Sequence, residues 1–156
     1  MQSRVSHKKE PKQTRILVVE DVVNVATVLK TRLEAYGYIV CDVATTGAKA
    51  IAGAIEHQPD LILMDILLKG KMNGIEAAER IRSRFDIPII YLSCLNDQKI
   101  LDRAIKTKPY GFILKPYDNE ELRFSIENAL IKHREDRARK AHIAELEQAQ
   151  SSLTGS

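Results

Sequence analysis

The chain has 156 residues, of which 44% are hydrophobic and 29% are charged, and its net charge is +3. This composition is typical of a globular protein rather than of a disordered chain, and the length suits one domain with appendages. The sequence contains no apolar run near the roughly 20 residues of a membrane span, and its basic start lacks the apolar segment of a signal peptide. We therefore expect a cytoplasmic protein that does not enter a membrane.

Basic residues are concentrated in two flanking segments. Residues 1–15 carry five basic side chains and one acid, and residues 132–142 carry five basic side chains and two acids. Residues 16–131 are slightly acidic. Because the positive charge lies outside the expected core, it favours solvated tails over a nucleic-acid-binding surface, and we expect no direct nucleic-acid binding.

Apolar runs alternate with helical patterns along the chain. Residues 1–13 have no periodicity and are predicted to form a disordered basic leader. The predicted elements are strand 15–19, helix 22–36, strand 39–44, helix 46–57, strand 61–64, helix 74–85, strand 89–93, helix 97–106, strand 111–114 and a helix from residue 118. Strands that alternate with helices in this way predict a doubly wound α/β fold with a five-stranded parallel sheet over residues 14–131.

Local signals refine these elements. The first helix carries apolar residues at helical spacing, namely Val25, Val28, Leu29 and Leu33. Gly37 suits the C-terminal end of this helix. Either Thr45 or Thr46 can cap the second helix, and either Asn96 or Asp97 can cap the fourth.

The isolated cysteines and histidines carry no ligand spacing. We expect Cys41 and Cys94 to be reduced and buried. The four histidines are expected at the surface: His7, His57, His133 and His142.

Polar side chains follow four of the predicted strands. Glu20 and Asp21 follow the first, Asp65 the third, Ser93 ends the fourth and Lys115 follows the fifth. Because parallel strands deliver such residues to one edge of the sheet, we expect them to gather there. Clustered carboxylates without His or Cys favour Mg²⁺, and the lysine and hydroxyl suit a phosphoryl group. Aspartate is also an accepted phosphoryl nucleophile.

The chain resembles the response-regulator receiver domain of two-component signalling, over about residues 14–130. The residues that carry the resemblance are the acidic pair Glu20-Asp21, Asp65, Ser93, Phe112 and Lys115-Pro116. The implied fold is the flavodoxin-like (βα)₅ receiver fold, and the implied role is a phospho-accepting switch rather than an enzyme. The implied partner is a sensor histidine kinase.

The resemblance also implies a role for each site residue. Asp65 would accept the phosphoryl group from a phosphohistidine. Mg²⁺ would be held by Asp21, Asp65 and the backbone carbonyl of Leu67, with help from Glu20. Lys115 would pair with Asp65 and then with the phosphoryl group, while Ser93 and Phe112 would form the switch. The family's lysine–proline bond is cis, which implies a cis Lys115–Pro116 bond here.

The loop over residues 66–74 departs from the family pattern, because it lacks proline and is about two residues longer than usual. It resembles the loop of receivers attached to sensory kinases. Glu20 replaces the commoner aspartate, which lengthens the arm and favours a water-mediated metal contact.

Two other functions remain open at this point. A haloacid-dehalogenase-like phosphohydrolase also uses an aspartate nucleophile, but it needs a second aspartate two positions later. Val23 and Leu67 occupy those positions after Asp21 and Asp65, which disfavours the enzyme. An unphosphorylated docking domain is disfavoured because all five groups of the site are present.

The last segment, residues 132–156, is predicted to be a helical extension or linker. Ile143, Leu146, Gln150 and Leu153 have a 3-4-3 spacing that suits a short two-stranded coiled coil. The alternative is a solvated helix with Glu135–Arg139 and Asp136–Lys140 pairs. Receivers commonly pair through the fourth helix, fifth strand and fifth helix, so we expect a weak homodimer through this face and the extension.

Overall fold

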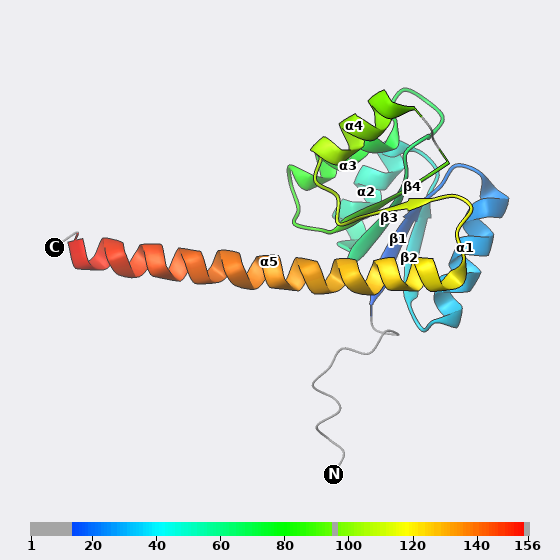
Figure 1. The fold of residues 1–156 in the computed structure, drawn as a ribbon. Coiled ribbons are helices and arrows are strands. Elements are labelled where there is room, and N and C mark those ends of the chain that lie inside the picture. The colour runs from blue at the N-terminus through cyan, green and yellow to red at the C-terminus, as the bar shows by residue number, and fades with distance from the viewer. Residues whose placement is uncertain (1–13, 95–96, 155–156) are drawn as a thin grey trace, which may run out of the picture.

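A five-stranded parallel sheet forms the centre of the computed structural model, which describes residues 14–94 and 97–154 (Figure 1). The elements are β1 (Arg15–Val19), α1 (Val23–Ala35), β2 (Ile39–Ala44), α2 (Gly47–His57), β3 (Leu61–Asp65), α3 (Gly74–Arg82), β4 (Ile89–Ser93), α4 (Gln98–Lys106), β5 (Gly111–Leu114) and α5 (Asn119–Thr154). The strand order is β2-β1-β3-β4-β5, so β2 is added on one side of β1 and all later strands are added on the other side. The predicted doubly wound α/β fold is confirmed. The leader predicted for residues 1–13, and Asn96, lie outside the described residues.

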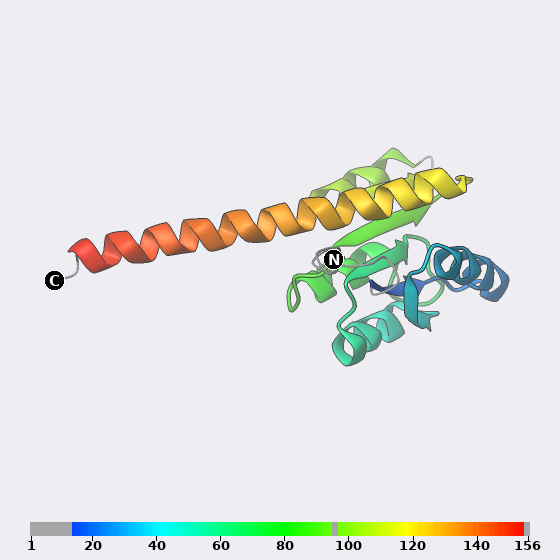
Figure 2. The ribbon, with the colours of Figure 1, turned by 90° about the horizontal axis from the view of Figure 1, so that it is seen from below.

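Helices cover both faces of the sheet. Helices α1 and α5 pack on one face through Leu29, Leu33, Leu122, Ile126 and Ala129. Helices α2, α3 and α4 cover the other face. Figures 1 and 2 show the two layers from perpendicular directions. Every residue of β3 and β4 is buried, which explains why these strands read as continuous apolar runs instead of alternating patterns.

The core face of α1 differs from the prediction. Leu29 and Leu33 are buried as expected, but the third buried residue is Ala26. Val25 and Val28 are 38% and 52% exposed. Residues 26, 29 and 33 form one row along a helix, and residues 25 and 28 are each rotated from that row by about 100°. The sequence offers leucines in one row and valines in the other, so apolar type alone could not exclude the valines from the core.

The helix ends follow their local signals closely. Thr46 accepts a hydrogen bond from the Lys49 backbone N–H, and Asp97 caps α4. Gly37 follows the end of α1 with φ +91°, a conformation that glycine adopts without strain. Helix α3 ends at Arg82, three residues before the predicted end.

Helix α5 is 36 residues long and projects beyond the domain. Figures 1 and 2 both show its C-terminal half leaving the rest of the molecule. Residues 137–153 are all exposed. The helix runs without interruption through residue 131, so the predicted domain boundary there stays a prediction. Among the described residues, none of the helices combines the length and apolar character of a membrane span.

The cysteines and one histidine are placed differently from the prediction. Both cysteines are free, but Cys94 is exposed and Cys41 only half-buried. Cys94 follows the last residue of β4, where the chain has already left the core. His133 was expected at the surface and is only 8% exposed, because it lies on the same row of α5 as Ile126 and Ala129.

Candidate functional site

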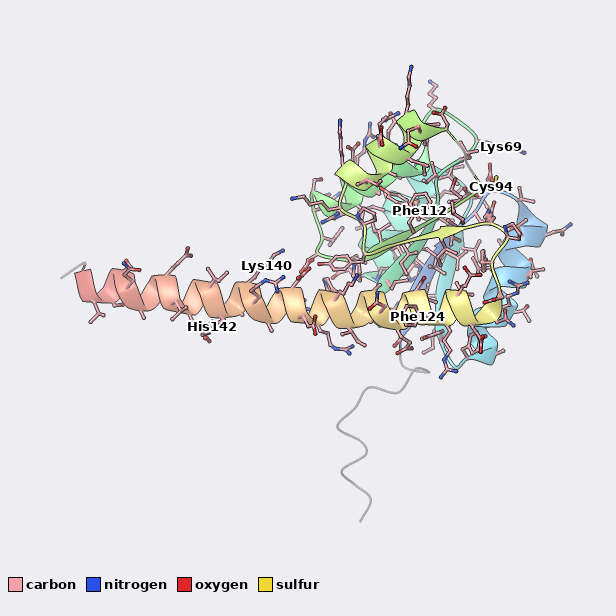
Figure 3. The ribbon with its side chains drawn as sticks, in the orientation of Figure 1. Lys69, Cys94, Phe112, Phe124, Lys140 and His142 are labelled. Carbon is pink, nitrogen blue, oxygen red and sulfur yellow. The ribbon has the colours of Figure 1, made fainter. Side chains whose placement is uncertain are left out.

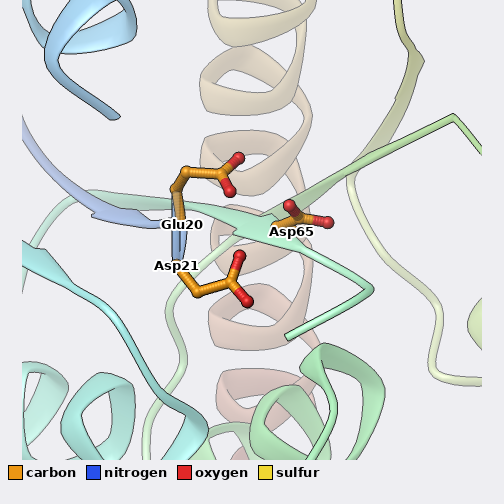
Figure 4. A group of neighbouring side chains, drawn as sticks. All are labelled: Glu20, Asp21 and Asp65. Carbon is orange, nitrogen blue, oxygen red and sulfur yellow. The ribbon is translucent and has the colours of Figure 1, made fainter. Parts of the chain in front are cut away.

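The C-terminal ends of the strands bring the predicted site residues to one edge of the sheet. Glu20 and Asp21 directly follow β1, and Asp65 is the last residue of the neighbouring strand β3. Figure 4 shows the three acids side by side at the ends of these two strands. Lys115 follows β5, and its backbone N–H donates to the Ser93 carbonyl at 2.8 Å. The structure therefore gathers residues that lie up to 95 positions apart in the sequence.

The three acids form one cluster. One carboxylate oxygen from each of Glu20, Asp21 and Asp65 lies within 4.8 Å of the other two. Glu20 is 1% exposed and Asp65 is 6% exposed, whereas Asp21 is half-buried. Carboxylate oxygens at this spacing, without nitrogen or sulfur ligands, are the donor set that suits a hard divalent cation. The chemistry of the residues present thus fits Mg²⁺.

Lys115 is shared by the two buried acids. Its Nζ lies 3.1 Å from Oε1 of Glu20 and 3.3 Å from Oδ2 of Asp65. Burial alone would lower the pKa of Lys115, but the negative charges of Asp65 and Glu20 outweigh it and raise the pKa above its ordinary value. One ammonium group nevertheless faces three carboxyl groups, so the cluster has too little positive charge when no cation is bound.

Asp65 shows the consequence of this imbalance. Burial and then the charge of Glu20 raise the pKa of Asp65 from 3.8 to about 6, and Lys115 and the Leu67 backbone N–H only partly oppose them. The Leu67 N–H donates to Oδ1 of Asp65 at 3.0 Å. Perturbed carboxyl groups of this kind are concentrated at functional sites.

Backbone groups of the neighbouring loops also bind the acids. The Val22 N–H donates to Oε2 of Glu20 at 3.1 Å, and the Lys69 N–H donates to Oδ2 of Asp21 at 2.9 Å. The long loop after Asp65 therefore folds back onto the acid at the end of β1. The sequence did not reveal the Lys69 contact, because a backbone donor leaves no signature in residue type.

Gly74 holds the start of α3 against the site strand. A Cβ at this position would lie 2.1 Å from the backbone oxygen of Asp65, a distance that no side chain can adopt. Asn73 and Glu76 form a capping box at the same helix end. Sequence reasoning treated Gly74 only as the first residue of a helix. In the sequence, the glycine directly after the capping residue Asn73 was the signal that this helix start packs closely against another backbone segment.

The remaining predicted residues lie around this cluster. Ser93 is 1% exposed at the end of β4, and the side chain of Leu67 is 47% exposed. Phe112, labelled in Figure 3, is half-buried in β5, and its ring packs edge-on against Tyr91 with centroids 6.3 Å apart. The bond between Lys115 and Pro116 is cis.

Comparison with known proteins identifies the family. Residues 16–127 match the sequence model of the response regulator receiver domain. The chain belongs to this family. The receiver domain is the regulatory domain of two-component response regulators, and such domains interact with histidine kinases. The predicted receiver fold and signalling role are confirmed, and the phosphohydrolase alternative is not favoured.

Curated relatives of this receiver domain are named as transcriptional regulators. The chain is 33% identical to the probable transcriptional regulator ycf27 of Cyanidium caldarium over 129 residues, which cover 81% of the chain and 50% of that protein. It is 30% identical to the transcriptional regulatory protein PdtaR of Mycobacterium tuberculosis over 132 residues, 85% of the chain and 64% of that protein. The chain thus spans less than two thirds of these curated relatives. Because both are named as transcriptional regulators, the absence of direct nucleic-acid binding stays a prediction.

Solved structures match the fold closely. The signal receiver domain of a modulated diguanylate cyclase from Desulfovibrio desulfuricans is 34% identical with a TM-score of 0.75, covering 78% of this chain and 97% of that one. A two-component response regulator of the LuxR family from Aurantimonas is 28% identical with a TM-score of 0.71, covering 77% and 87%.

Proposed function

We propose that Asp65 accepts a phosphoryl group from the phosphohistidine of a sensor histidine kinase. A carboxylate oxygen of Asp65 forms a bond to phosphorus while the bond from phosphorus to the imidazole nitrogen breaks, and the electron pair of that bond returns to the ring. The observation that carries this proposal is the contact of Lys115 with Asp65 inside a cluster of three acids. No other aspartate at the end of a described strand combines burial with a lysine partner.

The acids are suited to hold Mg²⁺ beside Asp65. Asp21, Asp65 and the backbone carbonyl of Leu67 would be its protein ligands, and Glu20 would contribute through its longer arm. When bound, the cation would neutralise charge on the phosphoryl oxygens. The close approach of three carboxylate oxygens supports this assignment.

Lys115, Ser93 and Phe112 are proposed to respond to the phosphoryl group. The Lys115 ammonium, already 3.3 Å from Asp65, would pair with a phosphoryl oxygen, and the Ser93 hydroxyl would donate to another. Phe112 would move inward behind Ser93. These changes would alter the face formed by α4, β5 and α5, which carries the exposed apolar residues Ile105, Leu114 and Phe124.

Exposed apolar side chains on this face suit a protein partner. We propose weak self-association through α4, β5 and α5, extended by the projecting part of α5. The partner that receives the signal would contact the same face. A cytoplasmic location stays a prediction.

A small phosphoryl donor tests the role of Asp65 without the kinase. Acetyl phosphate with Mg²⁺ should add one phosphoryl group to the wild-type chain, detected by intact-mass spectrometry, and none to Asp65→Asn. Asp102→Asn is the matched control, because Asp102 is exposed and accepts a hydrogen bond from Gln98 on the same helix. This control should be modified like wild type.

An equal yield of adduct in Asp65→Asn would remove Asp65 from the role. A folded wild-type chain that is never modified, and that does not bind beryllofluoride with Mg²⁺, would favour the unphosphorylated docking domain instead.

A further inference from the structure

The projecting part of α5 is helical without support from the domain. Residues 137–153 are exposed throughout and follow one another in a single helix. Figure 3 shows His142 on this part of the helix, on the side away from the sheet. Isolated helices of this length are only marginally stable in water. A packing partner would therefore stabilise the segment.

Contacts at its root fix the direction in which the helix leaves the domain. The Tyr110 hydroxyl donates to Oδ2 of Asp136 at 2.5 Å. One turn earlier, His133 Nε2 lies 3.0 Å from Oδ1 of Asp86, and the His133 ring packs edge-on against Tyr110. These contacts fix the helix to the domain up to Asp136. Arg139 and Lys140 still line a pocket with Arg82 and Tyr110, so the helix is clear of the domain only beyond Lys140.

An apolar seam begins at Ile143, two helical turns after Asp136. The seam consists of Ile143, Leu146, Gln150 and Leu153, at the 3-4-3 spacing of a and d positions in a heptad. Ile143, Leu146 and Leu153 are 47%, 56% and 83% exposed. At about 100° per residue, the seam lies roughly a quarter turn away from the row that packs on the sheet. Its apolar side chains are therefore available to another helix.

The charges beside the seam favour a second copy of the same helix in parallel register. In this register each g residue faces the e residue five positions later on the partner helix. Glu135 would face Lys140, and His142 would face Glu147. The first contact joins opposite charges and the second joins a histidine to an acid, so neither contact is repulsive. An antiparallel pair that stacks Ile143 on Leu153 would instead place Glu147 against Glu147.

Polar residues define where the pairing begins and how it is aligned. Gln150 at an a position would meet Gln150 of the other helix, and a single polar a residue fixes register at some cost in affinity. Asp136 and Arg139 would occupy the preceding seam positions, but they form an ion pair within one helix, and Asp136 is bonded to Tyr110. The apolar packing should therefore begin at Ile143, and the Glu135–Lys140 contact would flank the coil just before it.

We propose that the seam of α5 pairs with the seam of a second copy as a short, parallel, in-register coiled coil. This inference deepens the self-association proposed above and does not depend on the phosphorylation of Asp65. The coil would place two receiver domains side by side with their α5 roots adjacent.

Sedimentation equilibrium of the full chain tests the seam. Leu146→Asp should weaken self-association at least tenfold and lower the helical signal in circular dichroism. The control Gln148→Asp adds the same charge two residues away, at the outward-facing f position, and should associate like wild type. Equal association of both variants, or a wild-type chain that stays monomeric at every concentration, would overturn the proposal.

A charge exchange tests the register. Glu135→Lys and Lys140→Glu should each associate several-fold more weakly than wild type, because like charges then meet at both g–e positions. An equimolar mixture of the two variants should associate at least as tightly as wild type, since both contacts become attractive. A mixture no tighter than either variant alone would exclude the parallel register. Acetyl phosphate should modify Asp65 equally in every variant, so a failure of phosphorylation and a failure of pairing are seen separately.

Discussion

Replacing Asp65 by asparagine should stabilise the unliganded fold, and by an amount that depends on pH. Burial and Glu20 raise the pKa of Asp65 from 3.8 to about 6. The folded state therefore holds this proton more tightly than the unfolded state, and the wild type loses stability as pH rises from about 4 to above 6. Asparagine carries no charge and avoids this loss.

The size of the effect follows from the shift. The difference between about 6 and 3.8 is roughly two pKa units, and each unit corresponds to about 1.36 kcal/mol, so the upper limit is about 3 kcal/mol. Asparagine also forfeits the ion pair with Lys115, which leaves that lysine with Glu20 alone. We expect a net gain of roughly 1–3 kcal/mol above pH 6 and a much smaller difference near pH 4.

Urea denaturation followed by circular dichroism measures the difference in unfolding free energy above pH 6 and near pH 4. A chelator is present so that no divalent cation binds. The control Asp102→Asn should show little change at either pH. Excess Mg²⁺ should stabilise the wild type by mass action and leave Asp65→Asn nearly unaffected. The difference in unfolding free energy between the two proteins should therefore become smaller. A gap that is independent of pH, or an asparagine variant less stable than wild type at neutral pH, would refute the electrostatic argument.

Three further outcomes are expected. The affinity for Mg²⁺, measured by calorimetry, should fall as pH drops through about 6, because the protonated Asp65 competes with the cation; a flat profile from about pH 5 to 8 would contradict this. Gly74→Ala should lower the free energy of unfolding by about 2 kcal/mol or more, since its Cβ meets the Asp65 backbone, whereas Gly53→Ala, whose Cβ meets side-chain atoms of Leu17 at 3.3 Å and Asp42 at 3.9 Å, should cost less. Tyr110→Phe should cost about 1 kcal/mol and speed amide exchange around Asp136 without changing the phosphorylation of Asp65; unchanged exchange would show that the tail root does not need this bond.

The fold was predictable because its strongest signals are local and periodic. Continuous apolar runs identified the buried strands, and capping residues located the end of α1 and the starts of α2 and α4. The sequence wrongly placed Val25 and Val28 in the core face of α1, because apolar residues occupy two neighbouring rows and only the tertiary structure decides between them. It also misjudged His133, because burial on an extended helix depends on how far the domain reaches along it.

The gathering of the acids with Lys115 was predictable from topology, since parallel strands deliver their C-terminal residues to one edge. The contacts and the burial that set the pKa values of the site were not predictable from the sequence. The contact of Lys69 with Asp21 comes from a backbone N–H, and the raised pKa of Asp65 depends on burial, which residue type does not encode. Topology thus predicts which residues form the site, but their protonation states follow only from the three-dimensional structure.

The two adjacent acids at the end of β1 illustrate how much depends on side-chain direction. Glu20 is buried, and its two oxygens accept from Lys115 and from the Val22 N–H. Asp21 is half-buried and faces the loop, where the Lys69 N–H binds one oxygen. Glu20 therefore contacts Lys115 beside Asp65, which supports the proposal that Asp21 rather than Glu20 would meet a cation directly. The longer arm of glutamate is consistent with this division, since it carries a carboxylate from the end of β1 to a lysine that follows β5, on the far side of two intervening strands.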